Sequence, residues 1–228
     1  MAQLEGRVAV VTGAGDGIGA AIARRYVAEG ARVVIAELDE PRGRAVADEL
    51  DDRAVFVATD AGDKDQMEAA VAAAVTVFGG LDILVNNAWG GGRISRVEQK
   101  TPELLAHGLA VGFTGPLWAM IAAHGVMKPR GYGRIVNLCS LNGVNAHMGT
   151  LEYNTAKEAL RTATRTAARE RADTGIVVNA LCPAAKSASF RAVMAEHPEL
   201  EAAADASNPM GRIGDTDDDI APVAVFLA

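Results

Sequence analysis

Short runs of β-branched residues alternate with longer alanine-rich stretches along the whole chain. Six of these runs are predicted strands: Arg7–Thr12, Arg32–Glu37, Ala54–Thr59, Leu81–Asn86, Arg134–Leu138 and Gly175–Leu181. The intervening stretches have helical spacing: Ile18–Glu29, Arg42–Leu50, Lys64–Phe78, Pro102–Met127 and Glu152–Ala172. Continuously apolar strands that alternate with helices indicate a parallel sheet covered by helices on both faces. We therefore expect a doubly wound α/β domain that binds its ligands beyond the carboxyl ends of the strands.

Composition limits the classes of function open to this chain. With 228 residues it can bury one sizeable core, and we expect residues 1–228 to form a single domain. The net charge of −7 and the lack of any Lys/Arg run argue against a nucleic-acid partner. The apolar run before Gly13 is too short for a signal peptide or a membrane span, so we expect a cytoplasmic protein with no membrane partner. Cys139 and Cys182 are too few for a disulfide framework and are expected to be small buried side chains.

A glycine cluster follows the first predicted strand and opens the first predicted helix. Glycines at such a place permit a tight turn and let the backbone approach a pyrophosphate, which the helix N-terminus stabilises. A glycine cluster alone is often only a turn, but its position between a strand and a helix favours dinucleotide binding in a Rossmann-type fold. The candidate cofactor-binding residues of this segment are Gly13, Gly15, Asp16, Gly17, Ile18 and Gly19.

An acidic residue, Glu37, ends the second predicted strand. A carboxylate there can accept both hydroxyls of an adenosine ribose, and it would repel a 2′-phosphate by roughly 4 kcal/mol per unit charge at about 4 Å and an effective dielectric near 20. Asp16 and Leu38 occupy positions where a protein that binds the 2′-phosphate of NADP would need Arg or Lys. Arg42 and Arg44 follow closely, but a solvated helix face explains them better. The sequence therefore favours NAD over NADP.

Tyr153 and Lys157 are four residues apart and so share one face of a predicted helix. For a Tyr to act as a base near neutral pH, its pKa must fall by about 3 units, or roughly 4 kcal/mol. One ammonium group at about 4 Å in a partly screened site supplies a Coulomb energy of roughly that size. The pair is thus a sufficient acid/base device, although the same spacing also occurs in surface pairs.

Ser140 ends the fifth predicted strand, where the architecture places ligands. Its hydroxyl can orient a carbonyl or alcohol oxygen of a substrate. The competing interpretation is a helix cap or a turn.

Together, the TGAGDGIG segment, Asn86-Asn87-Ala88, Ser140 and the YNTAK segment that begins at Tyr153 resemble the short-chain dehydrogenase/reductase family. The similarity runs along the whole chain. It implies hydride transfer between C4 of a nicotinamide and a carbonyl or alcohol carbon, with Tyr153 exchanging the proton, Lys157 lowering its pKa and binding ribose, and Ser140 positioning the substrate. Asp60 and Asn87 resemble the family's adenine- and ribose-side contacts, and Ala88 is a further candidate cofactor-binding residue. A homo-oligomer, either a dimer or a tetramer, and the absence of a catalytic metal are further expectations.

The chain departs from the family pattern at four places. Gly112 replaces the Asn that usually completes the catalytic group, so either water fills the gap or the proton path differs. Trp89 and the three glycines after it replace the last residue of the NNAG motif, which indicates a reshaped loop. A family Thr near the cofactor carboxamide falls at Ala188, with Ser187 or Ser189 as substitutes. The chain also stops at Ala228, before the family's last strand, so we expect a sheet without that strand.

The substrate is the least constrained part of the prediction. Residues 184–216 are irregular, with a helix expected near Phe190–Glu196, and form either a substrate lid or a surface excursion. The candidate substrate-side residues are mostly apolar and favour a hydrophobic secondary alcohol or ketone, with cyclic and steroid-like compounds among the options: Leu141, Asn142, Val144, His147, Met148, Phe190 and Met194. Two alternatives remain, a non-catalytic NAD-binding module and an isomerase or dehydratase on the same scaffold.

Overall fold

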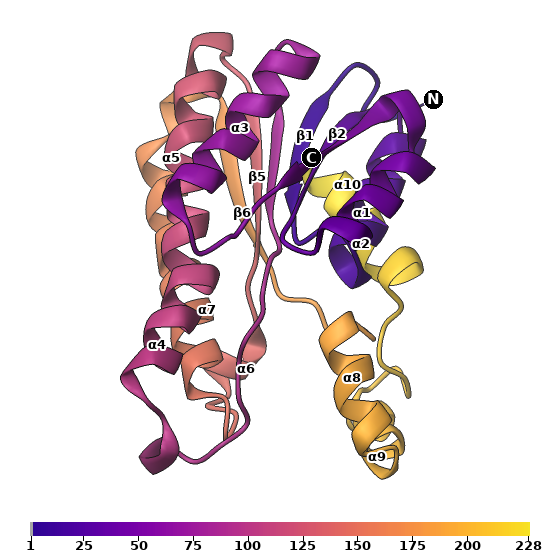
Figure 1. Ribbon diagram of the computed structural model, residues 1–228, viewed down its shortest axis with the longest axis vertical. Coiled ribbons are helices and arrows are strands. Elements are labelled where there is room, and N and C mark those ends of the chain that lie inside the picture. The colour runs from indigo at the N-terminus through magenta and orange to yellow at the C-terminus, as the bar shows by residue number, and fades with distance from the viewer. Residues whose placement is uncertain (1) are drawn as a thin grey trace.

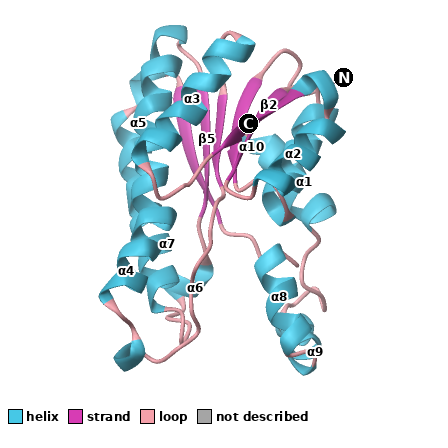
Figure 2. Ribbon diagram, in the orientation of Figure 1, coloured by secondary structure: helices cyan, strands magenta, loops and turns pink. Residues whose placement is uncertain are grey.

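The computed structural model describes residues 2–228, apart from the side chains of Ser189, Val193, Glu199 and Ser207. Its centre is one six-stranded sheet in the order β3-β2-β1-β4-β5-β6, with every neighbouring pair parallel (Figures 1 and 2). The strands are β1 (Val8–Thr12), β2 (Arg32–Glu37), β3 (Ala54–Ala58), β4 (Ile83–Asn86), β5 (Gly133–Leu138) and β6 (Ile176–Leu181). This is the predicted doubly wound arrangement, in which the strand order reverses between β1 and β4.

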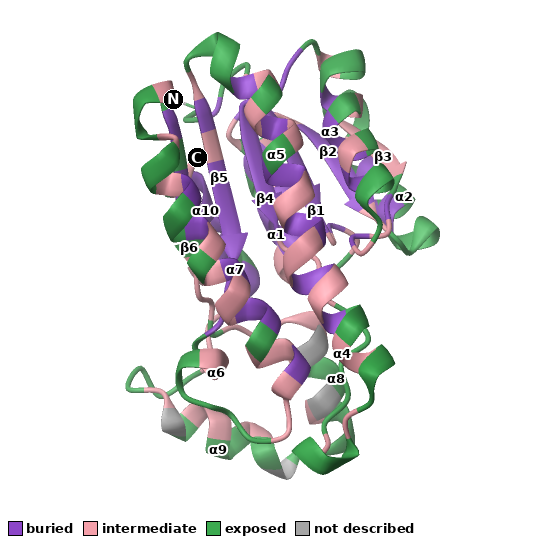
Figure 3. Cartoon of the chain, turned by 90° about the vertical axis from the view of Figure 1, so that its left-hand side faces the viewer, coloured by how far each residue is buried: buried purple, intermediate pink, exposed green. Residues whose placement is uncertain are grey.

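Helices cover both faces of the sheet, as predicted. One face carries α1 (Gly17–Ala28), α2 (Glu40–Glu49) and α10 (Ala221–Leu227), and the other carries α3 (Lys64–Phe78), α5 (Gly115–Met127) and α7 (Leu151–Glu170). Each face buries its own apolar cluster, and the central strands are buried along their whole length (Figure 3). Because these strands are buried on both faces, their sequences are continuous apolar runs and not alternating apolar and polar residues.

Aspartate side chains set the starts of three of these helices. Asp16, Asp39 and Asp63 each accept a hydrogen bond from a backbone N–H in the first turn of α1, α2 and α3. Such a cap satisfies a donor that has no partner within the helix. The cap at Asp39, followed by Pro41 in the first turn, makes α2 begin before the predicted start at Arg42.

The predicted helix Pro102–Met127 is interrupted. It consists of α4 (Pro102–Leu109), a π-helical turn at Ala110–Thr114, and α5. By length and composition the stretch Pro102–Arg130 would also suit a membrane span, with a mean hydropathy of 1.5. Within the protein part of this stretch packs on the sheet, where Met120 and Met127 are fully buried.

Residues 184–216 form an excursion with two helices, α8 (Ala188–Glu196) and α9 (Glu199–Ser207). The first was predicted and the second was not. The base of the excursion is closed by Ala185 and Gly214, which form a β-bridge flanked by hydrogen bonds from Lys186 N to Gly214 O and from Gly214 N to Ala184 O. Both helices lie beyond the carboxyl ends of the strands in Figures 1 and 3.

The remaining elements are short. A one-turn helix, α6 (Leu141–Val144), follows β5. The 3₁₀ turns are Asp51–Arg53, Val97–Gln99, Lys128–Arg130 and Ala172–Thr174, and a second π-helical turn spans Thr216–Ile220.

Candidate active site

The fold brings Ser140, Tyr153 and Lys157 together at the carboxyl end of β5. Ser140 follows this strand directly, while Tyr153 and Lys157 lie on successive turns of α7. The ammonium of Lys157 donates a hydrogen bond to Leu138 O at 2.7 Å, which fixes the lysine beneath the end of the strand. The Ser140 hydroxyl lies beside the Tyr153 phenol and accepts a hydrogen bond from Asn142 N at 3.1 Å. The structure therefore shows Ser140 as the cap of α6, and the same hydroxyl is next to Tyr153.

Burial dominates the electrostatics of this cluster. It raises the pKa of Tyr153 above its usual value, although the neighbouring Ser140 side chain acts in the opposite direction. It lowers the pKa of Lys157 to about 8, since the charged ammonium loses its hydration. Tyr153 in the ligand-free protein is accordingly a protonated phenol, the state that donates a proton.

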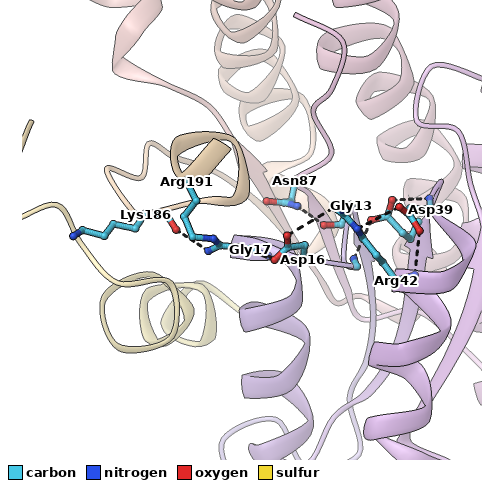
Figure 4. A network of polar contacts seen from close by, with 10 residues as sticks. Gly13, Asp16, Gly17, Asp39, Arg42, Asn87, Lys186 and Arg191 are labelled. Atoms are coloured by element: carbon cyan, nitrogen blue, oxygen red, sulfur yellow. Dashed lines mark hydrogen bonds and ion pairs between the residues drawn. The ribbon is translucent and has the colours of Figure 1, made fainter. Parts of the chain in front are cut away.

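The glycine turn lies next to this cluster across the β1–β4 junction. The side-chain amide of Asn87 donates to Thr12 O and Gly13 O, both at 2.9 Å, and the Thr12 hydroxyl accepts from Asn87 N and Ala88 N. These bonds hold the turn against the segment that follows β4 (Figure 4). Asn87 thus shapes the turn through its amide, a role that its sequence position did not reveal.

The turn fits the pyrophosphate of a dinucleotide. A Cβ on Gly13 would lie 2.8 Å from Ala88 Cα, and one on Gly19 would overlap Gly13 O. Only glycine therefore allows this close backbone approach, and the N–H groups of the first turn of α1, which have no partners within the helix, point out of it. Gly15, Gly17 and Ile18 complete the same strand–turn–helix unit.

Glu37 ends β2 and lies beside the glycine turn. Its carboxylate accepts hydrogen bonds from Gly15 N at 2.9 Å, Leu38 N at 2.8 Å and Asp39 N at 3.0 Å, so its negative charge is held beside the glycine turn. Arg42 is exposed and forms ion pairs with Asp39 at 3.3 Å and Asp16 at 3.8 Å. The nearest arginine charge is therefore already matched by two carboxylates.

Asp60 lies in the loop after β3, where its carboxylate accepts from Gly62 N at 2.8 Å and its own N–H donates to Gln66 Oε1. These contacts order the loop that leads into α3.

The excursion that follows β6 reaches the glycine turn. Arg191 on α8 forms an ion pair with Asp16 at 2.8 Å (Figure 4). The start of α8 is also close to the turn, since a Cβ on Gly17 would lie 2.9 Å from Ala188 N. Ser187 hydrogen-bonds Phe190 N through its hydroxyl, and the side chain of Ser189 lies outside the described residues.

Exposed apolar side chains lie on segments near Ser140, and we refer to this area as the candidate entrance. Leu141, Val144 and Met148 are 55%, 52% and 75% exposed, and Ile94, on the segment that packs against Gly149, is 69% exposed. Asn142, Phe190 and Met194 are half-buried, and His147 is an exposed residue whose carbonyl accepts from Asn154 Nδ2.

A buried ion pair behind the site was missed by the sequence analysis. Lys100 and Glu152 approach to 2.6 Å with side chains that are only 6% and 2% exposed. Burial favours a higher pKa for Glu152, but hydrogen bonds from Lys100 and Arg93 N outweigh it and lower the pKa. No local pattern links positions 52 apart in sequence, so the only available signal was the charge of Glu152 on a helix face next to Tyr153.

The fold and the glycine turn define a nicotinamide-type dinucleotide-binding α/β protein, and comparison with known proteins gives the family. A family model described as short chain dehydrogenase matches residues 7–198. The chain belongs to the short-chain dehydrogenase/reductase family of oxidoreductases, whose members use nicotinamide cofactors.

Three relatives illustrate the breadth of this family. A 3-alpha-(or 20-beta)-hydroxysteroid dehydrogenase from Mycobacterium bovis is 39% identical over 181 residues, which cover 79% of this chain and 69% of the relative. Galactitol 2-dehydrogenase from Agrobacterium fabrum is 35% identical, with 99% of this chain and 91% of the relative covered. The crystal structure of a 3-ketoacyl-(acyl-carrier-protein) reductase from Brucella melitensis, complexed with NADH, is 34% identical and superposes with a TM-score of 0.91 over 98% of this chain and 91% of that one.

Proposed function

We propose that this protein is an NAD-dependent oxidoreductase that interconverts a hydrophobic secondary alcohol and its ketone. The observation that carries the proposal is the convergence of Ser140, Tyr153 and Lys157 at the carboxyl end of β5, where the buried Lys157 ammonium is fixed by its hydrogen bond to Leu138 O. A protein that only binds a dinucleotide has no use for a buried phenol and ammonium aimed at the substrate side of the site.

The bound nicotinamide supplies the hydride or accepts it. In ketone reduction the Tyr153 hydroxyl donates the proton to the carbonyl oxygen, and the Ser140 hydroxyl orients this oxygen by a hydrogen bond. Lys157 holds a ribose hydroxyl of the cofactor and stabilises the phenolate that remains, which then regains a proton from solvent. Because burial keeps Tyr153 protonated in the free protein near neutral pH, the phenol is in the form that donates a proton in ketone reduction, and alcohol oxidation, which needs the phenolate, gains rate as the pH rises.

The preference for NAD is supported by the charges around Glu37. A 2′-phosphate next to this carboxylate would meet a negative charge, while the closest guanidinium, on Arg42, is engaged by Asp39 and Asp16. Glu37 and the backbone of the turn suit the two ribose hydroxyls of NAD. We expect a homo-oligomer, a dimer or tetramer, as is typical of the family, and a cytoplasmic location.

The apolar substrate class is supported by the candidate entrance. Leu141, Val144, Met148 and Ile94 present large exposed apolar side chains there, and burying them against a hydrophobic alcohol would release about 25 cal/mol per Å². The relatives act on substrates that range from a steroid to a polyol by their names, so this class rests on the residues of this chain. We further propose that residues 184–216 act as a lid, because α8 already contacts the glycine turn.

A screen of secondary alcohols and ketones, followed by NADH absorbance in wild type and Tyr153→Phe, tests the proposal. We expect turnover of bulky apolar substrates with NADH, and a loss of about 10²–10⁴-fold in kcat for Tyr153→Phe with NADH binding retained. Equal rates in the two proteins would contradict the mechanism, and a preference for NADPH would contradict the assignment to Glu37.

The second candidate, a non-catalytic NAD-binding module, is favoured by the lack of a side chain at Gly112. NADH binding by the wild-type protein without turnover of any substrate class would support it over the enzyme.

A further inference from the structure

The position of Gly112 is closed by a neighbouring side chain. A Cβ on Gly112 would lie 2.8 Å from Trp89 Cζ3 and 2.8 Å from Ala156 Cβ. Neither distance occurs between unstrained atoms, so even a methyl group has no room there. The indole of Trp89 therefore occupies the space that a side chain at position 112 would need.

The opposite side of the indole also borders a glycine. A Cβ on Gly92 would lie 3.2 Å from Trp89 Cζ2, tighter than ordinary van der Waals contact. Gly112, on the π-helical turn, and Gly92, in the loop after β4, thus form the two walls of an indole slot that also includes Ala156 of α7. The glycines after Trp89 let the loop turn back over its own side chain, and Gly91 has a φ of +77°.

Polar contacts fix the loop that forms this slot. The Glu152 carboxylate accepts from Arg93 N at 2.8 Å and pairs with Lys100, whose ammonium also donates to Gly149 O at 2.9 Å. His107 on α4 is within hydrogen-bond distance of Gly90 O, at 3.1 Å. The loop is therefore tied to α7 one residue before Tyr153, and its place relative to the phenol is set by a buried ion pair.

The indole in turn contacts the phenol. The ring centroids of Trp89 and Tyr153 are 4.7 Å apart with an interplanar angle of 75°, an edge-to-face pair, and the Lys157 ammonium lies 5.8 Å from both centroids. We propose that Trp89 is a positioning residue for Tyr153. Its indole is held in the slot between Gly112 and Gly92 and fills the space of the side chain that is missing at position 112. By packing against the phenol, the indole fixes Tyr153 in the orientation needed for proton transfer. This inference rests on the proposed function, in which Tyr153 exchanges the proton.

Kinetics with NADH and the best apolar ketone test this role. Trp89→Ala leaves the phenol free to turn, so we expect kcat per NADH-binding site to fall by about 10²-fold, while the KM for NADH stays within about twofold. Trp89→Phe keeps a ring edge against Tyr153 and is expected to recover most of this loss. A merely structural role would reduce the number of binding sites without changing kcat per site. The matched control is Trp118→Phe, which changes the other tryptophan, on α5, and leaves kcat unchanged.

Coupling between positions 89 and 112 tests the slot itself. We expect Gly112→Ala to lower kcat at least threefold more in the wild-type background than in the Trp89→Ala background, since part of its clash is with the indole. Equal losses in both backgrounds, or an unchanged kcat in Trp89→Ala, would overturn the proposal.

A spectroscopic test remains valid even if no substrate is turned over. In Trp118→Phe the emission comes from Trp89 alone, because the chain has two tryptophans. Adding Gly112→Ala should expel the indole from the slot and shift its emission to longer wavelength in the cofactor-free protein. An unchanged emission would overturn the slot, whereas an absence of turnover with a shifted emission would contradict only the proposed function.

Discussion

Two glycine-rich segments follow neighbouring strands of the same sheet, and they use their glycines in opposite ways. Gly13–Gly19, after β1, removes side chains so that backbone approaches backbone and the helix N-terminus stays open to a ligand. In the segment after β4, Gly92, together with Gly112, lacks a side chain so that the protein's own indole can fill the space. The same residue type therefore creates a site in one segment and closes one in the other. The neighbours of each glycine decide which occurs.

The largest change in stability is expected when the Lys100–Glu152 ion pair, which holds the Trp89 loop in place, is broken. Glu152→Gln leaves the buried Lys100 ammonium without its counter-charge, and we expect the free energy of unfolding to fall by about 3–5 kcal/mol. Urea unfolding measures this change. The control on the same helix is Glu158→Gln, which breaks a partly exposed pair with Arg161 and should cost less than about 1 kcal/mol. Similar costs for both variants would show that the ion pair does not hold the loop.

A smaller effect, a loss of NADH affinity, is expected from a substitution in the Gly13–Gly19 turn. In Gly19→Ala the new methyl group meets Gly13 O and lies 2.6 Å from Asn87 Nδ2, so the turn must shift. Overpacking of this kind costs about 1–3 kcal/mol, which corresponds to roughly a 5- to 150-fold weaker NADH affinity in a fluorescence titration. Gly90→Ala is the matched control, because a Cβ there meets nothing within 4 Å, and its affinity should be unchanged. A loss as large in Gly90→Ala would remove the distinction between the two segments.

The smallest expected effect comes from the ammonium beside the indole. The pKa of Lys157 is about 8 in the folded chain and near 10.5 in the unfolded one, so the unfolded chain binds more protons between these values. Stability contributed at this site therefore rises with pH, by roughly 1 kcal/mol between pH 8 and 9. Lys157→Met lacks this rise, and the comparison cancels other groups such as Cys139, whose pKa burial raises to about 11. Parallel stability curves of the two proteins over this range would show that Lys157 is not buried as described.

Some parts of the candidate site were predicted from the sequence, and others were seen only in the structure. The glycine turn, Glu37, Ser140, Tyr153 and Lys157 were named from the sequence because each acts within a few residues of a strand end or on one helix face. Asn87 was named for a cofactor contact, yet its amide holds the turn through Thr12 O and Gly13 O. The second helix of the excursion, α9, was missed because its alanine-rich segment carries no strong apolar period. The roles of the named residues remain predictions that the experiments above test.

The sequence by itself determined the doubly wound sheet, since alternating strands and helices with short connections allow few other arrangements. It also determined the place of the cofactor turn and the family resemblance. Only the tertiary structure decided what replaces the side chain missing at position 112. The contacts of Trp89 and Gly112 with α7, which carries both Glu152 and Ala156, join segments that are far apart in the sequence, and they depend on how closely α7 and the π-helical turn pack. Distances of a few tenths of an ångström settle whether such a gap admits a side chain, and no spacing rule along the chain contains that information.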